Sequence, residues 1–109
     1  MPLTLNFRVN QGVSVKEIIG KDEKTVDVVV RKIIGSSDGT EVSLEIYEGE
    51  KYRPIKLRKD ERYDVLPHST LHVNNAMLGL GRNRKISLTF YSPRSVEISR
   101  LKLYPERTS

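Results

Sequence analysis

The sequence predicts an all-β protein, a small single domain of two or more antiparallel hairpins that form a barrel- or sandwich-like sheet. Three observations lead to this prediction. Apolar and polar residues alternate in at least five segments, which is the two-residue period of a half-buried strand. Clusters of turn residues separate these segments at short intervals. No segment carries a helical apolar stripe of twelve or more residues.

The first strand is expected at residues 3–9, where Leu, Phe and Val occupy every second position. Val13 and Val15 are expected to continue this strand past Gly12. Residues 16–23 read either as a connection or as an irregular strand that ends in a charged turn.

Two hairpins follow. Residues 25–34 are almost entirely β-branched and should pair with residues 41–47, because the turn residues Ser, Asp and Gly lie between them. Residues 70–78 should pair in the same way with residues 85–91. Shorter elements are expected at residues 53–57 (a strand), 59–62 (a polar turn or one helical turn) and 96–98 (a strand).

The sequence of residues 85–91 predicts which side chains of this strand are buried. Ile86, Leu88 and Phe90 should face the core together, while Ser87 and Thr89 face the other way. This strand also resembles the one at residues 41–47.

The resemblance between these two strands leads to the hypothesis of an internal duplication, with repeats at 3–65 and 66–105 inside one domain of residues 1–105, followed by a polar tail at 106–109. The alternative is that two hairpins with the same alternation resemble each other by chance.

Composition narrows the class of protein. A chain of 109 residues accommodates one core, and 37% apolar with 30% charged residues is typical of a folded domain in water. No apolar run is long enough to cross a bilayer, and the absence of cysteine excludes disulfides and thiolate metal sites, so a reducing, cytoplasmic setting is expected. A net charge of +5 and a pI near 9.6 favour polyanionic partners, although a basic surface also serves solubility.

No arrangement of residues points to catalysis. Hydrolase, zinc-protease and phosphate-loop motifs are missing, and Gly79 and Gly81 lack the third glycine of a dinucleotide fingerprint. His68 and His72 are four residues apart, but no third ligand stands at metal-binding spacing. We therefore expect a protein that is not an enzyme and that holds no metal or cofactor.

Basic residues instead occur beside apolar strand positions, in a mixture that suits single-stranded RNA. Cations hold phosphates, while arginine planes and apolar side chains contact exposed bases. The alternative is a sheet edge that lysine and arginine protect against aggregation. The clusters are Asn6–Arg8, Ile55–Lys59, Gly81–Lys85, and Arg94 with Arg100–Lys102.

The run from Lys85 to Arg100, with Ser92-Pro93-Arg94 at its centre and Val96-Glu97-Ile98 after it, resembles the carbon storage regulator family of small bacterial RNA-binding translational regulators. The resemblance is strongest over residues 79–104, where Gly79-Leu80-Gly81 and Tyr104 also fit. It implies post-transcriptional regulation through single-stranded or hairpin RNA that carries a G-G-A motif. It also implies that the first strand lies beside the last strand, either between the two chains of a homodimer or within one chain.

The resemblance and the basic clusters together predict a set of RNA-contacting residues. Arg100 is the first choice in this set, and Ile55 and Leu57 are weaker candidates. The set comprises Leu5, Arg8, Lys59, Arg82, Arg84, Arg94, Val96, Ile98 and Arg100.

Two other readings remain open at this point. A non-enzymatic protein-interaction domain or a virion structural β-domain would also consist of short basic strands without catalytic residues. A cyclic-dinucleotide sensor of the PilZ type would use Arg58 and Arg62, whose spacing resembles the first motif of that family.

Overall fold

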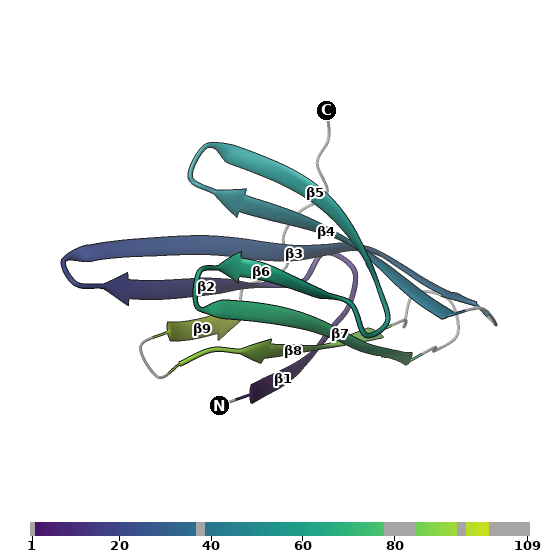
Figure 1. Cartoon of the computed structure of the whole chain (residues 1–109). Coiled ribbons are helices and arrows are strands. Elements are labelled where there is room, and N and C mark those ends of the chain that lie inside the picture. Colours follow the sequence, from purple (N-terminus) through teal and green to yellow (C-terminus); the bar gives the residue numbers. More distant parts are fainter. Residues whose placement is uncertain (1, 37–38, 78–84, 94–95, 101–109) are drawn as a thin grey trace.

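The computed structural model describes residues 2–36, 39–77, 85–93 and 96–100, and it confirms the all-β prediction (Figure 1). The described residues form nine strands in two antiparallel sheets. The strands are β1 (Pro2–Phe7), β2 (Gly12–Ile19), β3 (Asp22–Ser36), β4 (Gly39–Glu48), β5 (Lys51–Arg58), β6 (Arg62–Leu66), β7 (Ser69–Met77), β8 (Lys85–Tyr91) and β9 (Val96–Arg100).

The two sheets are built mainly from meanders. The five-stranded sheet has the order β5-β4-β3-β2-β9, and the four-stranded sheet has the order β1-β8-β7-β6. Both predicted hairpins are present, since β3 pairs with β4 and β7 pairs with β8. The first and last strands pair with strands that are distant in the sequence. β1 lies beside β8 at one edge of the four-stranded sheet, and β9 lies beside β2 at one edge of the five-stranded sheet.

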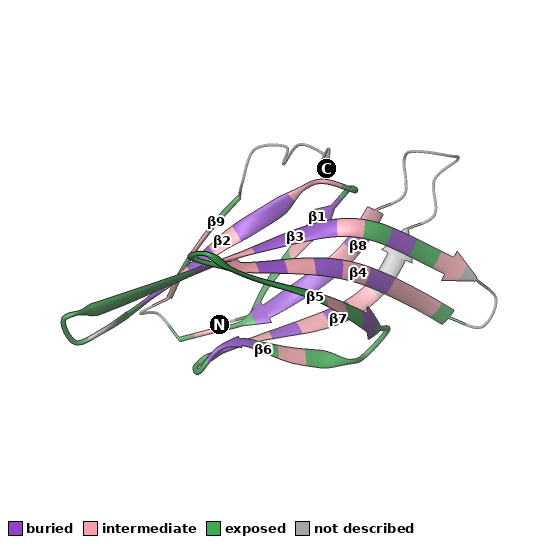
Figure 2. Ribbon diagram, turned by 90° about the horizontal axis from the view of Figure 1, so that it is seen from above, coloured by how far each residue is buried: buried purple, intermediate pink, exposed green. Residues whose placement is uncertain are grey.

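A single core lies between the sheets, as the buried stripes along the strands indicate (Figure 2). Valines of the five-stranded sheet pack against larger side chains of the four-stranded sheet, and the rings of Phe7 and Phe90 meet edge to face with centroids 6.4 Å apart. Complete burial of one such aliphatic or aromatic side chain stabilises a fold by about 1.5–3 kcal/mol. The sequence contains no cysteine, so no disulfide reinforces this packing.

The burial predicted for β8 is confirmed. Ile86, Leu88 and Phe90 are fully buried. Thr89 points to the opposite face but is also buried, and its hydroxyl is satisfied there by a hydrogen bond with that of Thr4 at 2.8 Å and by one from Asn74 at 2.7 Å.

The expectation that Val13 and Val15 continue the first strand is wrong. The chain leaves β1 at Phe7, turns at Asn10 with a φ of 71°, and enters β2 in the other sheet. Backbone hydrogen bonds from Asn10 and to Gln11 hold this turn against Val30. A single break in an otherwise continuous alternation therefore separates two strands of different sheets.

For residues 16–23, the strand alternative is the correct one. β2 continues to Ile19, and the turn is confined to Gly20 and Lys21. Glu17 lies on the inner face and is only 1% exposed, and its Oε1 is 2.6 Å from Nδ1 of His68 in the turn between β6 and β7. This pair links the two sheets and gives Oε1 of Glu17 a polar partner, whereas the buried Oε2 has no hydrogen-bond partner among the described residues.

The hypothesis of an internal duplication stays a prediction. The strands after the two hairpins pair differently, since β5 adds to β4, whereas β9 crosses to β2. The segment 101–109, which includes the expected polar tail, lies outside the described residues.

Candidate nucleic-acid interface

Three of the predicted RNA-contacting residues lie outside the described part of the chain. They are Arg82, Arg84 and Arg94. The other predicted residues fall into two groups at different edges of the molecule.

The first group lies where the end of β1 meets the end of β9. Arg8 is exposed in the turn after β1, and its backbone N–H donates to Oε1 of Gln11 at 2.8 Å. Arg100 is exposed on β9, donates from Nη1 to the carbonyl oxygen of Asn6 at 3.0 Å, and places its guanidinium carbon 5.3 Å from the centroid of the Phe7 ring. Arg100 thus ties the end of one sheet to the end of the other.

The apolar members of this group face inward. Leu5, Val96 and Ile98 are half-buried and pack against the core, and so does the weaker candidate Ile55. Leu57 is more deeply buried, with 7% of its surface exposed. These side chains contribute packing in the described structure, and only their remaining surface faces solvent.

The second group lies along β5, which is the outermost strand of the five-stranded sheet. Pro54 fits this position, since proline in a sheet is confined to edge strands and bulges. Lys59 directly follows the strand, where its backbone N–H donates to the carbonyl of Thr40 at 3.0 Å. From Lys51 to Lys59 the chain contains no acidic residue and five cations, namely Lys51, Arg53, Lys56, Arg58 and Lys59.

All five cations of this run, which we call the β5 basic edge, are exposed. Arg53 donates to the hydroxyl of Tyr63 at 2.9 Å. Within the described residues, no carboxylate comes within 4.0 Å of the charged groups of the five. Glu41 and Glu48 of β4 stand opposite Arg58 and Lys51 in register, so the edge is most strongly positive around Lys56, which faces Ser43.

The two groups are well separated. β5 and β9 are the opposite edges of the five-stranded sheet, four strand spacings apart, which amounts to roughly 19 Å. Lys59 therefore does not share one surface patch with Arg100, and the structure divides the predicted set into a β1–β9 corner and the β5 basic edge.

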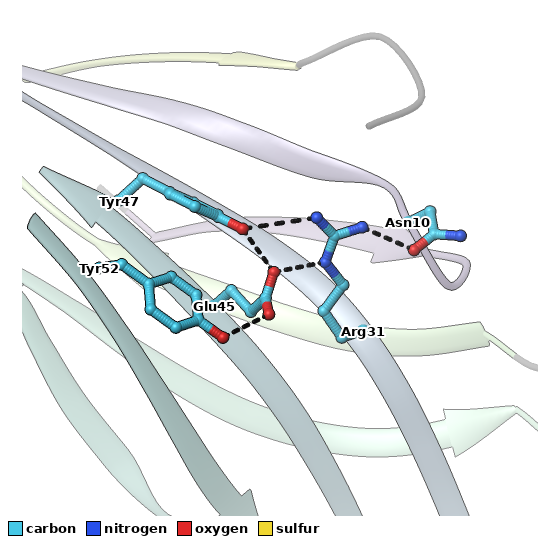
Figure 3. A network of polar contacts seen from close by, with 5 residues as sticks. All are labelled: Asn10, Arg31, Glu45, Tyr47 and Tyr52. Atoms are coloured by element: carbon cyan, nitrogen blue, oxygen red, sulfur yellow. Dashed lines mark hydrogen bonds and ion pairs between the residues drawn. The ribbon is translucent and has the colours of Figure 1, made fainter. Parts of the chain in front are cut away.

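The outer face of the sheet beside the β5 basic edge carries a polar network (Figure 3). Glu45 accepts hydrogen bonds from Nε of Arg31 at 2.6 Å, from the hydroxyl of Tyr47 at 2.5 Å and from the hydroxyl of Tyr52 at 2.6 Å. Arg31 also donates to Oδ1 of Asn10 at 2.8 Å and to Tyr47 at 3.5 Å.

A β-bulge places Arg31 in this network. The register between β3 and β4 shifts between Val30 and Lys32, so Arg31 is the extra residue of β3. The shift also explains why Val30 and Ile33 are both buried although they are three positions apart.

The charges of the network stabilise each other. Burial would raise the pKa of Glu45, but hydrogen bonds from Tyr47, Tyr52 and Arg31 and the charge of Arg31 outweigh it and hold the pKa of this carboxyl below its ordinary value. Burial would likewise lower the pKa of Arg31, and its bonds to Tyr47 and Glu45 raise it instead. Both groups are ionised at neutral pH, and they hold the two tyrosines in place.

A hollow of about 370 Å³ is lined in part by Lys51, Tyr52 and Arg53 together with the acidic Glu48 and Asp64, and two more hollows adjoin the β5 basic edge. One, of about 430 Å³, lies beside Arg58, Lys59 and Thr40 at the end of the strand. The other, of about 350 Å³, lies between β4 and β5 and is lined in part by Arg31, Pro54 and Lys56.

No family model, curated protein sequence or solved structure matches this chain. The function must therefore be argued from the chain itself.

The histidines have separate surroundings. His68 contacts Glu17, whereas Nδ1 of His72 is 2.8 Å from Oδ1 of Asn74 and its Nε2 is 3.6 Å from Oδ1 of Asp60. In the described ranges, no three histidine, aspartate or glutamate side chains are grouped in a way that could hold a metal ion. The same ranges contain no helix that could serve as a membrane span.

The prediction from sequence included Lys59 and missed most of the other residues around it. The cations of the run were visible as a cluster, but their position at a sheet edge follows from pairing between β4 and β5. The tyrosines gave no signal, because the Arg31–Glu45 contact that organises them joins residues fourteen positions apart.

Proposed function

We propose that this protein binds RNA and that the β5 basic edge is its phosphate-binding surface. The observation that carries the proposal is the run Lys51–Lys59, in which four exposed cations on the edge strand and a fifth directly after it have no carboxylate within ion-pair distance among the described residues. Cations without acidic partners can neutralise the phosphates of a nucleic acid backbone, and this releases the counterions condensed on that backbone.

The alternation of β5 divides its cations between the two faces of the strand. Lys56 and Arg58 lie on the outer face with Pro54, whereas Arg53 points toward the neighbouring sheet, where it contacts Tyr63. A strand of eight residues spans roughly 26 Å. Such a length suits a strand of several nucleotides better than a single small ligand.

In this proposal the β1–β9 corner has a different role. Arg100 already uses its guanidinium to bond Asn6 and to cover Phe7, so we assign it primarily to the joint between the sheets. A cytoplasmic setting and the absence of catalysis remain parts of the proposal.

Binding of a fluorescein-labelled twelve-nucleotide single-stranded RNA tests the proposal by fluorescence anisotropy. At about 150 mM salt, each phosphate contact to a single strand increases the binding constant roughly fourfold. The double variant Lys56→Ala, Arg58→Ala should therefore bind this RNA roughly tenfold more weakly. The matched control is the double variant Lys21→Ala, Lys24→Ala, which removes the same amount of charge. These two lysines lie at the turn between β2 and β3, where β3 begins, whereas Lys56 and Arg58 lie near the end of β3. If both double variants lose the same amount of RNA affinity, the binding depends only on net charge and the proposed surface is wrong.

A comparison of RNA hairpins with and without G-G-A tests the resemblance separately. A preference that persists at about 200 mM salt would support the carbon storage regulator mechanism, and Arg100→Ala should then weaken binding by about 1–3 kcal/mol. Binding without such a preference would support the β5 basic edge without that mechanism.

A second candidate function is pairing with another protein through β1. This strand is the outer strand of its sheet, carries no charged residue, and exposes 40% of Leu3, whereas natural edge strands usually carry charges that prevent pairing. If the parent protein binds no RNA at physiological salt, this protein-interaction function becomes the leading one.

A further inference from the structure

The outer face beside the β5 basic edge presents an aromatic ring in a fixed position. Tyr52 is 41% exposed, and its hydroxyl donates to Oε2 of Glu45 at 2.6 Å (Figure 3). Its ring is tilted 45° against that of Tyr47, with centroids 5.3 Å apart. Because these contacts already restrict the ring, little conformational entropy remains to be lost when a ligand packs on it.

A mostly apolar hollow opens on the same stretch of sheet. This is the hollow of about 350 Å³ between β4 and β5, whose lining includes Glu45 and Pro54. Glu45 stands opposite Pro54, and Tyr47 stands opposite Tyr52, one alternation away on the same face. The ring and the hollow are therefore neighbours.

Two cations of the β5 basic edge extend this surface. Lys56 lines the hollow, and Arg58 follows on the same face of the strand. Tyr52 and Lys56 are four residues apart, a distance of roughly 13 Å along a strand. An aromatic platform followed by cations on one face is the arrangement that binds unstacked bases and the phosphates that follow them.

We propose that Tyr52 and the adjoining hollow form a nucleobase subsite that stacks one unpaired base, while Lys56 and Arg58 hold the phosphates beside it. This inference rests on the proposed RNA binding and deepens it, because it restricts the ligand to single strands. Bases within a duplex keep their faces in the stack and cannot reach the ring.

The subsite accepts any base with little discrimination. Glu45 and Arg31 direct their polar atoms at each other and at the tyrosines, so recognition relies on the π-face that every base offers. Glu45 and Arg31 act as positioning residues for Tyr52.

The test compares Tyr52→Ala with the parent on three labelled probes at about 150 mM salt: U12, C12 and a twelve-base-pair RNA duplex. Loss of a stacking ring should weaken U12 and C12 binding roughly 5- to 150-fold and change duplex binding less than about twofold. Tyr52→Phe should retain most of the affinity. Tyr91→Ala is the matched control, because Tyr91 is 43% exposed and belongs to the other sheet.

A second measurement uses only the parent protein. A twelve-unit abasic ribose-phosphate strand should bind at least fivefold more weakly than U12, since it has phosphates but no bases. Equal binding of the two strands would overturn the subsite, as would a large preference of the parent for one of U12 and C12. If Tyr52→Ala binds U12 normally while Lys56→Ala, Arg58→Ala does not, the subsite is wrong and the β5 basic edge stands. If the parent binds none of the probes, both proposals are wrong.

Discussion

Replacement of Glu45 by Gln should destabilise the protein at neutral pH by about 2–3 kcal/mol. The carboxylate accepts three hydrogen bonds of 2.5–2.6 Å, and a hydrogen bond to a charged group contributes about 1.5–3 kcal/mol. Gln keeps the shape and one carbonyl acceptor but loses the charge that faces Arg31. Because the Glu45 side chain is only 15% exposed, solvent screens this loss less than it would at the surface.

The stability of Glu45→Gln should also depend less on pH than the stability of the parent does. The pKa of Glu45 is lowered in the folded protein from its ordinary value of 4.5, so its contribution to stability is fully present above that value and is lost as the pH falls through the lower, folded-state pKa. The difference in unfolding free energy between the parent and Glu45→Gln should therefore narrow progressively below about pH 4.5.

Urea denaturation at a series of pH values from 7 to 3 measures this difference. Glu41→Gln provides the control, since Glu41 belongs to the same strand and face but forms no ion pair among the described residues, and its effect should stay within about 0.5 kcal/mol. A Glu45→Gln variant as stable as the parent at pH 7, or a difference that is constant down to pH 3, would refute the reasoning about the network.

Three further substitutions test the fold by urea denaturation. Leu88→Ala removes a fully buried side chain and should cost about 2–5 kcal/mol, and a cost below 1 kcal/mol would show that this face is not the core. Gly12→Ala should destabilise by several kcal/mol, because a Cβ there would lie 2.2 Å from the backbone oxygen of Val28, and unchanged stability would contradict the contact between β2 and β3. His68→Ala should lower the free energy of unfolding by about 1–3 kcal/mol. This is less than the loss expected for a fully buried pair, because the His68 side chain is 63% exposed. Adding Glu17→Gln to His68→Ala should restore part of the lost stability. No recovery in the double variant would show that the Glu17 side chain left without its partner is not the cause.

The fold class was predictable from sequence because alternation is a local property. Ile86, Leu88 and Phe90 alternate with polar residues, and the structure buries all three. The assignment of strands to sheets depends on distant contacts, and this is why Val13 and Val15 were placed in the wrong strand. The inner position of Glu17 was equally hidden, since it requires His68 fifty-one positions away.

The candidate interface was predictable only in part, for similar reasons. The cations of the β5 basic edge are visible in the composition of nine consecutive residues, but the edge position of Lys56 and Arg58 depends on pairing. The bulge at Arg31 interrupts the period of two on which sequence reasoning relies. The platform that this bulge builds with Tyr52 was therefore not foreseen.

The location of bound RNA tests the central claim most directly. A protein of 12.5 kDa gives well-resolved amide spectra, and titration of the ¹⁵N-labelled parent with U12 would map the surface that the RNA contacts. We expect the largest amide shifts at residues 51–59 and at Tyr47 and its neighbours on β4, with small shifts at the β1–β9 corner. Shifts concentrated on Arg8 and Arg100, with none along β5, would contradict the account.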